Sequence, residues 1–413
     1  MNKQEIIESI AKNVAGQGNQ VDIAGKLSDI LTSIIGIIPD FSQPFTNPVG
    51  PWCPDPCFWK ADDGYFYIKG TGRLNTVKRT RDFVHIEDTG KTFITQDAVD
   101  ALFTLYGHYA TDDPAYKLHP HQWAPYVIKI GQNWVMYMAI VERTGTKDAP
   151  EDGTAHIVAF TSRTPYGYFG NPVTIVSDNE IKASATSSTK WNNVIDPFVY
   201  CDPYDNKLKI LAGSSYAIRR AVLADDGLSL DPSTFATHAA GQSISTDPSR
   251  KTVYEGAYLY SKVCGGHLYD YLFVSAGDYT TREYCIKVGR RERDGMIGGN
   301  SPINFIDKND TPMRTGGGEL ILSTESDDSQ FWGPGHIGGI FESADGRTFM
   351  LYHCHDGNGD GDRKLFIQEL FWDENGWPYA ANNGHPVEGG EAPKFIITGT
   401  PDVFVYEAQS EQK

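Results

Sequence analysis

The sequence predicts an all-β protein, a five-bladed β-propeller with a short helical N-terminal extension. Three observations lead to this prediction. Helical periodicity stops near residue 45, short alternating apolar runs separated by Gly, Asp and Asn turns follow it, and five of these runs form similar two-strand units. With 413 residues, 40% hydrophobic residues, 42 glycines and 23 prolines, the chain is long and turn-rich enough for one large β body.

Residues 1–45 are expected to form the helical extension and a linker. Apolar residues recur every four positions in 3–15, and a second periodic segment covers 22–38. The segment 39–52 holds four prolines among polar and aromatic residues, which suits an extended linker better than a regular element. We therefore place the domain boundary near residue 45 and the propeller at 46–413.

Five stretches after this boundary have the same internal order. Each offers an apolar strand, a polar turn and a second strand rich in Tyr, Phe or Ile that closes on small residues, which predicts a β-hairpin. The hairpins are 55–71, 124–139, 196–214, 255–277 and 336–353. Their starts recur every 60 to 80 residues, roughly, which fits four-stranded blades with long loops.

The first strands of these repeats bring polar residues together. In a propeller the first strand of each blade lies innermost, so the five strand starts meet at one end of the central channel. They carry Asp55, the Gln122–Trp123 pair, Asp196, Glu255 and His336. An acid in a single Asp-Pro turn usually binds its own backbone. Turn chemistry does not require three acids at one place in three repeats, so we favour a functional site.

Three carboxylates around one axis suit glycoside hydrolysis. That reaction needs a general acid for the leaving oxygen and a second carboxylate that activates water or attacks the sugar. A third acid close to the proton donor raises the donor's pKa by like-charge repulsion and keeps it protonated.

Ordered motifs along residues 46–405 resemble the family 43 glycoside hydrolases, and within them the endo-arabinanases. The motifs are WAPYVI, IDPFVY, GSSYAIRRAVLADDG, YEGAYLYSK, YLFVSAG, YCIKVGRR, TPMRTGGGEL, GPGHIGGIF, MLYHCHDG and FWDENGWP. The resemblance implies a five-bladed propeller that hydrolyses arabinan, xylan side chains or related plant polysaccharides with inversion.

The resemblance also implies a role for each acid. Asp55 in PDPCF is the general base that activates water, and Glu255 in YEGAY is the general acid. Asp196 in IDPFV tunes the pKa of the donor and orients it.

Binding residues follow from the same motifs. Trp123 in WAP, and Ser214 and Tyr216 in GSSY, are expected to border the sugar subsites. His336 in GPGH is expected to face the channel centre, where arabinanases of this type hold a calcium ion that is coordinated largely by water.

Two departures from the family pattern concern the substrate. The first is Ala257, which follows Glu255-Gly256 where arabinanases usually have a proline after the glutamate and its small neighbour. The second is that residues 101–121 and 142–156 are longer or more polar than expected between these blades, and these segments should border the cleft. An endo-arabinanase is the favoured reading. An exo-acting arabinofuranosidase or xylosidase of the same family, and a non-catalytic carbohydrate-binding propeller, remain as alternatives.

Charge and hydropathy restrict the partners. A net charge of -17 and a pI near 5.0 oppose binding to nucleic acid and to anionic membranes, which leaves the polysaccharide as the expected partner. No stretch is apolar enough to span a membrane, and no signal peptide is visible. We expect an extracellular or particle-associated protein.

The N-terminal helices are outside the arabinanase pattern. The segment around QGNQVDIAGKL resembles short helical modules of bacteriophage virion proteins, so the extension is expected to mediate oligomerisation or docking to a larger assembly. The alternative is a helical cap on a blade edge, because unpaired strand edges need cover.

Overall fold

The computed structural model describes most of the chain. The described residues are 43–61, 63–72, 76–178, 194–202, 205–214, 217–239, 254–292, 305–359 and 361–394. The two predicted N-terminal helices lie outside these ranges. In the described part, no helix is long and apolar enough to cross a membrane.

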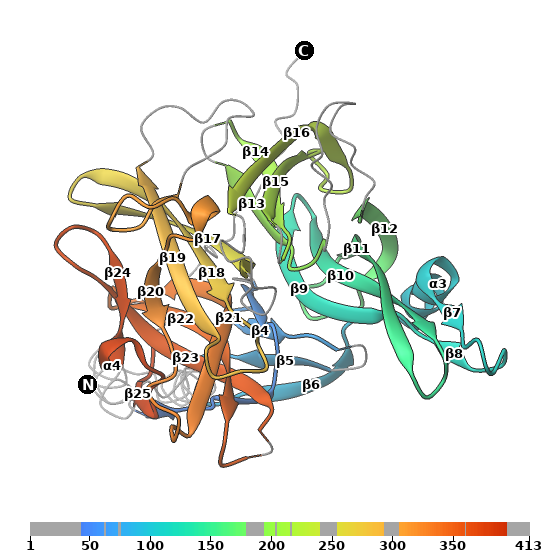
Figure 1. Ribbon diagram of the computed structural model, residues 1–413, viewed down its shortest axis with the longest axis horizontal. Helices are drawn as coiled ribbons and strands as arrows, with labels where there is room; N and C mark the ends of the chain where they lie inside the picture. The colour runs from blue at the N-terminus through green and yellow to red at the C-terminus, as the bar shows by residue number, and fades with distance from the viewer. Residues whose placement is uncertain are drawn as a thin grey trace, which may run out of the picture.

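Five antiparallel sheets form the blades (Figure 1). Blade 1 contains β3 (Cys57–Lys60), β4 (Phe66–Lys69), β5 (Thr76–Thr80) and β6 (Glu87–Thr92). Blade 2 contains β9 (His121–Ile130), β10 (Asn133–Gly145), β11 (Pro150–Ser162) and β12 (Gly170–Ser177). Blade 3 contains β13 (Phe198–Asp202), β14 (Lys207–Ala212), β15 (Ile218–Leu223) and β16 (Leu230–Ala239). Blade 4 contains β17 (Tyr254–Cys264), β18 (His267–Ala276), β19 (Cys285–Glu292) and β20 (Glu319–Leu322). Blade 5 contains β21 (Phe331–Glu342), β22 (Thr348–Asp356) and β23 (Arg363–Trp372), with β24 (Pro378–Ala380) also on β23.

The first strands of the blades form a closed ring. Strand β3 contacts β9, β9 contacts β13, β13 contacts β17, β17 contacts β21, and β21 returns to β3. The predicted five-bladed propeller is therefore confirmed. Each predicted hairpin corresponds to the first two strands of one blade.

The N-terminal strands close the ring. Strand β2 (Gly50–Trp52) pairs with β23 and is the outermost strand in the order β2-β23-β22-β21 of blade 5. Strand β1 (Pro44–Thr46) pairs with β25 (Gly389–Glu391) in a separate two-stranded sheet. The linker interpretation of this proline-rich segment was therefore wrong for these strands. Prolines are tolerated there because both are short strands at sheet edges.

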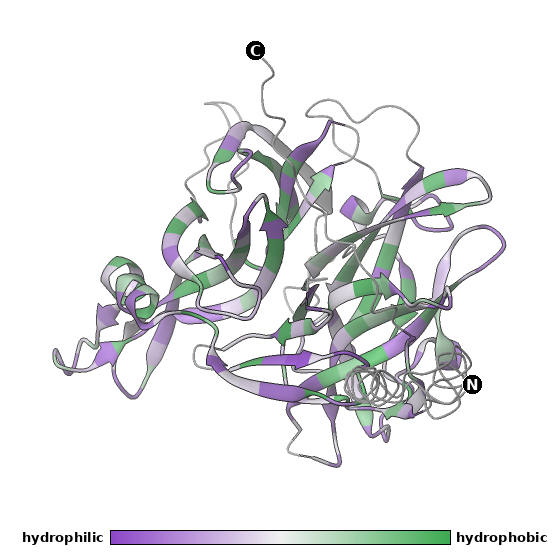
Figure 2. Cartoon of the chain, turned by 180° about the vertical axis from the view of Figure 1, so that it is seen from behind, coloured by the Kyte–Doolittle hydropathy of each residue, from purple (hydrophilic) through white to green (hydrophobic). Residues whose placement is uncertain are grey.

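Five apolar clusters lie between neighbouring blades and hold them together. Along β22, Phe349 and Leu351 pack into the cluster shared with blade 1, whereas Met350 and Tyr352 pack into the cluster shared with blade 4. Successive strand residues point to opposite faces, so a strand buried on both faces must be apolar almost continuously. Figure 2 shows these apolar stretches along the blades.

A lobe projects from blade 2. Helix α3 (Gln96–Tyr106), β7 (His108–Tyr109) and β8 (Lys117–Leu118) form it, at the right edge of Figure 1. The helix starts at Thr95, whose hydroxyl accepts a hydrogen bond from the backbone N–H of Ala98, and it buries Val99 and Leu102 in the core between blades 1 and 2. The sequence pattern did not predict this helix.

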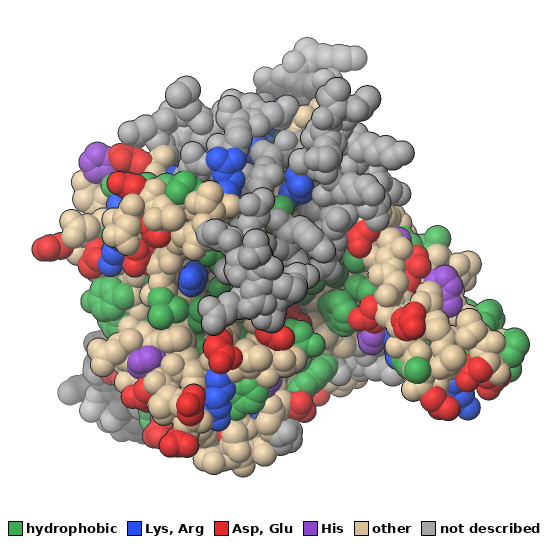
Figure 3. Space-filling model, viewed as in Figure 1, with side chains coloured by type: hydrophobic (Ala, Val, Ile, Leu, Met, Phe, Trp, Pro, Cys, Tyr) green, Lys and Arg blue, Asp and Glu red, His purple; other side chains and the backbone are tan. Residues whose placement is uncertain are grey.

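The charge of the described surface is predominantly acidic. Figure 3 shows acidic side chains spread over the blades and over the projecting lobe. This distribution agrees with the net charge of -17.

Candidate active site

The backbone has the same unusual conformation at the start of the first strand in every blade. Each blade has a residue with a positive φ there: Asp55 (49°), Ala124 (44°), Asp196 (55°), Gly256 (57°) and His336 (46°). Residues with a side chain rarely adopt this region, and such strain is concentrated at functional sites. The regular pairing of β9, β17 and β21 with the second strands is interrupted at the same place. The strand starts are therefore locally bulged around the axis.

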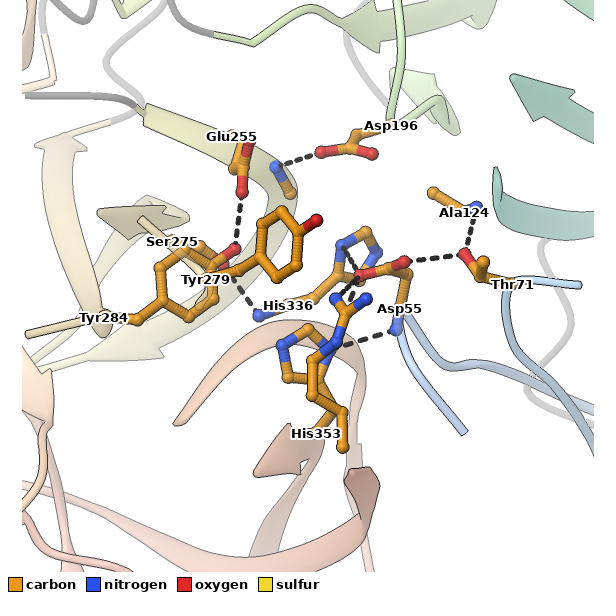
Figure 4. Close-up of polar contacts among 12 residues, drawn as sticks. Asp55, Thr71, Ala124, Asp196, Glu255, Ser275, Tyr279, Tyr284, His336 and His353 are labelled. Atoms are coloured by element: carbon orange, nitrogen blue, oxygen red, sulfur yellow. Dashed lines mark hydrogen bonds and ion pairs between the residues drawn. The ribbon is translucent and has the colours of Figure 1, made fainter. Parts of the chain in front are cut away.

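Side chains from the preceding blade hold these bulges. Four of the five backbone N–H groups donate to a side chain of the preceding blade, as Figure 4 shows: Asp55 to His353 Nδ1 (2.9 Å), Ala124 to Thr71 Oγ1 (2.9 Å), Gly256 to Asp196 Oδ2 (2.9 Å) and His336 to Ser275 Oγ (2.7 Å). Each predicted acid is thus connected to a neighbouring blade through short hydrogen bonds.

Asp55 is surrounded by groups that favour its ionised form. The Arg363 guanidinium lies 3.0 Å from Asp55 Oδ1, and the Thr71 hydroxyl donates to Oδ2 at 2.6 Å. The rings of His336 and His353 lie 3.6 Å and 3.5 Å from the same carboxylate. Burial opposes ionisation, but these neighbours, Arg363 first, hold the pKa of Asp55 well below its usual range. The carboxylate is therefore available to accept a proton.

Glu255 has the opposite electrostatic setting. Burial raises its pKa, the Asp55 charge raises it further, and the hydrogen bonds from Ser214 and Tyr284 partly oppose this rise. Both hydroxyls donate to the carboxylate at 2.7 Å, Ser214 to Oε2 and Tyr284 to Oε1. The carboxyl group is thus fixed in position and biased toward its protonated form.

Asp196 lies beside Glu255, and no cation among the described residues forms an ion pair with it. Its Oδ2 accepts the N–H of Gly256, the residue that follows the glutamate, at 2.9 Å. Burial first, and then the charges of Glu255 and Asp55, raise the pKa of Asp196 well above its usual range. The three acids therefore influence one another electrostatically, as expected for residues that share one site.

The predicted sugar-binding residues have separate outcomes. Trp123 lies at the axial end of β9 beside Ala124 and stacks on His121, with ring centroids 5.1 Å apart. Ser214 is buried and binds Glu255, so in this structure it positions the carboxyl group. Tyr216 lies outside the described residues, and its role stays a prediction.

Several residues at the site were not predicted, among them Thr71, Tyr284, Arg363 and Tyr279. Arg363 begins β23, and its guanidinium carbon lies 4.5 Å from the centre of the Tyr279 ring, which is 46% exposed. The carbonyl of Tyr279 accepts a hydrogen bond from His355 Nε2 at 3.0 Å, which holds its turn in place. Figure 4 shows the Tyr279 ring between Glu255 and Asp55. Neither Arg363 nor Tyr279 stands at a repeated position in the sequence, so the repeat pattern gave no signal for them.

The surroundings of His336 decide whether calcium fits. Among the described residues, no group of three or more His, Cys, Asp or Glu side chains is placed to hold a metal ion. His336 is buried, and burial lowers its pKa, which keeps the imidazole neutral. His353 Nδ1 accepts the N–H of Asp55, so its proton is on Nε2 and this ring offers no lone pair. Calcium prefers a cage of oxygen ligands, and these histidines supply none. The residues around His336 therefore fit only a calcium ion whose oxygen ligands are mainly water molecules.

The two cysteines that flank Asp55 have no chemical partner. Cys53 and Cys57 are buried free thiols, and burial raises the pKa of each to about 12. Reaction as a nucleophile requires the thiolate, so both act as packing residues.

Comparison with known proteins identifies the family. The profile described as "Glycosyl hydrolases family 43" matches residues 45–378, which is most of the chain. The "Probable arabinan endo-1,5-alpha-L-arabinosidase A" of Aspergillus fumigatus is 27% identical over 270 residues, which cover 62% of this chain and 72% of that protein. The "Extracellular endo-alpha-(1->5)-L-arabinanase 2" of Bacillus subtilis is 26% identical over 234 residues, 52% of this chain. The match covers only 47% of the Bacillus protein, about half its length.

Solved structures show the same fold. The Cellvibrio cellulosa alpha-L-arabinanase complexed with arabinohexaose superposes with a TM-score of 0.59 at 20% identity and covers 80% of this chain and 96% of its own. A xylan beta-1,4-xylosidase from Bacillus halodurans has a TM-score of 0.57 at 18% identity, covering 86% of this chain and 61% of its own. At these identities the structural likeness establishes the propeller fold, and the sequence profile establishes the relationship. The chain belongs to family 43 of the glycosyl hydrolases.

Proposed function

We propose that the protein is an inverting glycoside hydrolase that cleaves arabinofuranosyl linkages in arabinan-type plant polysaccharide. The observation that carries the proposal is the divergence of two pKa values at one site. The neighbours of Asp55 lower its pKa, and the surroundings of Glu255 raise the pKa of that residue. Two carboxyl groups whose environments push their pKa values apart are the pair expected of a general base and a general acid.

The reaction uses one water molecule. Ionised Asp55 removes a proton from water while the water oxygen attacks the anomeric carbon. Protonated Glu255 gives its proton to the glycosidic oxygen as the bond between that oxygen and the anomeric carbon breaks. Inversion requires about 6.5–9.5 Å between the two carboxyl groups to admit the water. The placement of the two acids on different blades, 1 and 4, supports this arrangement.

Asp196 is proposed to assist without touching the sugar. Its Oδ2 accepts the N–H of Gly256, which fixes the backbone beside Glu255, and burial together with the charge of Glu255 raises the pKa of Asp196 itself. Trp123, Tyr216 and the exposed ring of Tyr279 are proposed to border the sugar, because aromatic faces bury apolar area on a ligand while leaving polar groups free to bind.

The names of the relatives support arabinan as the substrate and action outside the cell. Two of them act on arabinan from within the chain, and a third is named as an extracellular exo-alpha-(1->5)-L-arabinofuranosidase of Cellvibrio japonicus, 28% identical over 112 residues, which cover 27% of this chain and 29% of that protein. Arabinan is therefore proposed with endo action, and exo action is the competing form.

A substrate panel tests the proposal. The purified protein should release reducing sugar from debranched arabinan in preference to arabinoxylan, xylan and nitrophenyl glycosides, and the early products should be oligosaccharides of several lengths. Early release of a single short product would establish exo action. Sugar binding without release from any member of the panel would refute the enzyme and favour a binding propeller.

Calcium at His336 is part of the proposal. The ion would supply a positive charge at the channel centre, with His336 and water as its ligands. A chelator should lower both turnover and the melting temperature, and added calcium should restore them. Unchanged values for both would remove calcium from the account.

The predicted helices of the N-terminal extension, residues 1–45, are proposed to mediate oligomerisation or docking to a larger assembly, which makes a particle-associated location the alternative to free secretion. A particle-sized complex in sedimentation would support docking, and a monomer that binds no assembly would contradict it.

A further inference from the structure

Blade 2 carries a concave pocket outside the active site. Its volume is about 770 Å³, and it lies among the start of α3, the start of β10, the end of β11 and the loop that leads into β12. The charged, amide and aromatic residues of its lining are Asp97, Asn133, Arg163, Tyr168 and Asn171. Nothing in the proposed reaction uses these residues.

The pocket lies at the end of the blade opposite to the catalytic residues. Strand β9 begins at the axial site with His121 and ends at Ile130, which pairs with Asn133 in the pocket wall. A strand rises about 3.3 Å per residue, so the seven steps from Trp123 to Ile130 separate the two sites by about 20 Å. A group bound in the pocket therefore cannot contact the reacting bond.

The loop that carries Tyr168 is fixed, although the tyrosine side chain is 48% exposed. The backbone N–H of Phe169 donates to the carbonyl of Phe93 at 2.9 Å, and the Ser162 hydroxyl donates to the carbonyl of Gly167 at 2.8 Å. Tyr168 itself has a φ of 59°, a costly conformation for a residue with a side chain. An exposed aromatic ring on a fixed, strained loop is preorganised for a ligand, because little conformational entropy is lost on binding.

The polar groups around this ring suit hydroxyl groups. Asp97 and Arg163 carry opposite charges, so the pocket has no strong preference for an anion or a cation, and neither side chain forms an ion pair with a described residue. Asn133 and Asn171 add amide donors and acceptors. Planar carboxylate, guanidinium and amide groups next to an aromatic platform match the paired hydroxyls and the apolar face of a neutral sugar.

We propose that this pocket is a second glycan-binding site, which holds a segment of the polysaccharide at a distance from the catalytic axis. The choice of arabinan as its ligand rests on the proposed function, whereas the existence of the site does not. A remote site of this kind keeps the enzyme on a long polymer between cleavage events and has no effect on short substrates.

Affinity electrophoresis through gels with debranched arabinan tests the site. In a Glu255→Gln background, which prevents cleavage of the gel polymer, Tyr168→Ala and Arg163→Ala should each weaken the retardation, about tenfold in Kd for the tyrosine. Tyr379→Ala is the matched control, because Tyr379 is a 50% exposed tyrosine on β24 away from the pocket. In the wild-type background all three variants should hydrolyse a short arabino-oligosaccharide at the normal rate.

Each outcome has one meaning. Retardation that is equal in the Tyr168, Arg163 and control variants would overturn the second site. Loss of short-substrate turnover in the Tyr168 and Arg163 variants would also overturn it, because the residues would then act on catalysis or folding. A wild-type protein that is retarded but does not hydrolyse arabinan would refute the proposed function and leave the second site standing.

Discussion

At the scale of single residues, the site moves the pKa values of two carboxyl groups in opposite directions by giving the two groups different neighbours. Asp55 faces a guanidinium, a hydroxyl and two neutral imidazoles, whereas Glu255 is buried and accepts hydrogen bonds only from hydroxyls among the described residues. Charge pairing favours an ionised carboxylate, and burial disfavours it. The proposed assignment of base and acid therefore rests on partners that the chain supplies from other blades.

The first prediction concerns Arg363, the strongest influence that lowers the pKa of Asp55. Arg363→Gln removes this charge, so the pKa of Asp55 should rise. Because the base must be ionised, the acid limb of the profile of kcat/KM against pH should move to higher pH. Arg347→Gln is the control, since Arg347 pairs with Asp345 far from the site. An unchanged acid limb would contradict the role of Asp55 as base.

The second prediction concerns Tyr284, whose hydroxyl stabilises the Glu255 carboxylate and so lowers its pKa. Tyr284→Phe should raise the pKa of Glu255 further. The acid must be protonated, so the alkaline limb of the same profile should shift to higher pH. Tyr379→Phe should leave it in place. A shift to lower pH would mean that Glu255 is not the group that titrates there.

At the scale of elements, repetition determined what the sequence could predict. Asp55 and Asp196 stand at the same position of two blades and Glu255 directly precedes that position in a third, so the propeller brings the three acids together whatever the conformation of the loops. Arg363 and Tyr279 come from a third strand and from a loop, where no repeat marks a position. Helix α3 did carry a signal, since Thr95 is a typical N-cap residue. The β pattern on both sides concealed this single short helix.

The third prediction concerns Asn47, which lies between β1 and β2 in the segment that closes the ring. The side chain of Asn47 is buried, accepts the N–H of Ile367 at 3.0 Å and donates to its carbonyl at 2.8 Å, as a strand partner would. Asn47→Ala leaves both buried groups unpaired and should cost about 2–4 kcal/mol. Denaturant unfolding measures this loss, and the exposed Asn309→Ala is the control. Equal stability of the two variants would show that the closure is not needed.

At the scale of the whole molecule, we propose a polysaccharide chain as the partner of this propeller. The predicted fold and family are confirmed. Both could be predicted from the sequence because the alternation of apolar residues and the order of the repeats do not depend on details of packing. The described surface adds two features that the repeat pattern could not provide, the lobe on blade 2 and the pocket at its far end. Both arise from loops, whose conformation is determined by contacts between segments distant in sequence.

The measurement that tests the central claim most directly is turnover of debranched arabinan by the Glu255→Gln variant, with binding of arabino-oligosaccharide measured on the same protein. The amide keeps the size of the carboxyl group but has no proton to give to the leaving oxygen. We predict that turnover falls by about 10³-fold or more while binding changes little. Turnover within a few-fold of the wild-type value would contradict the account.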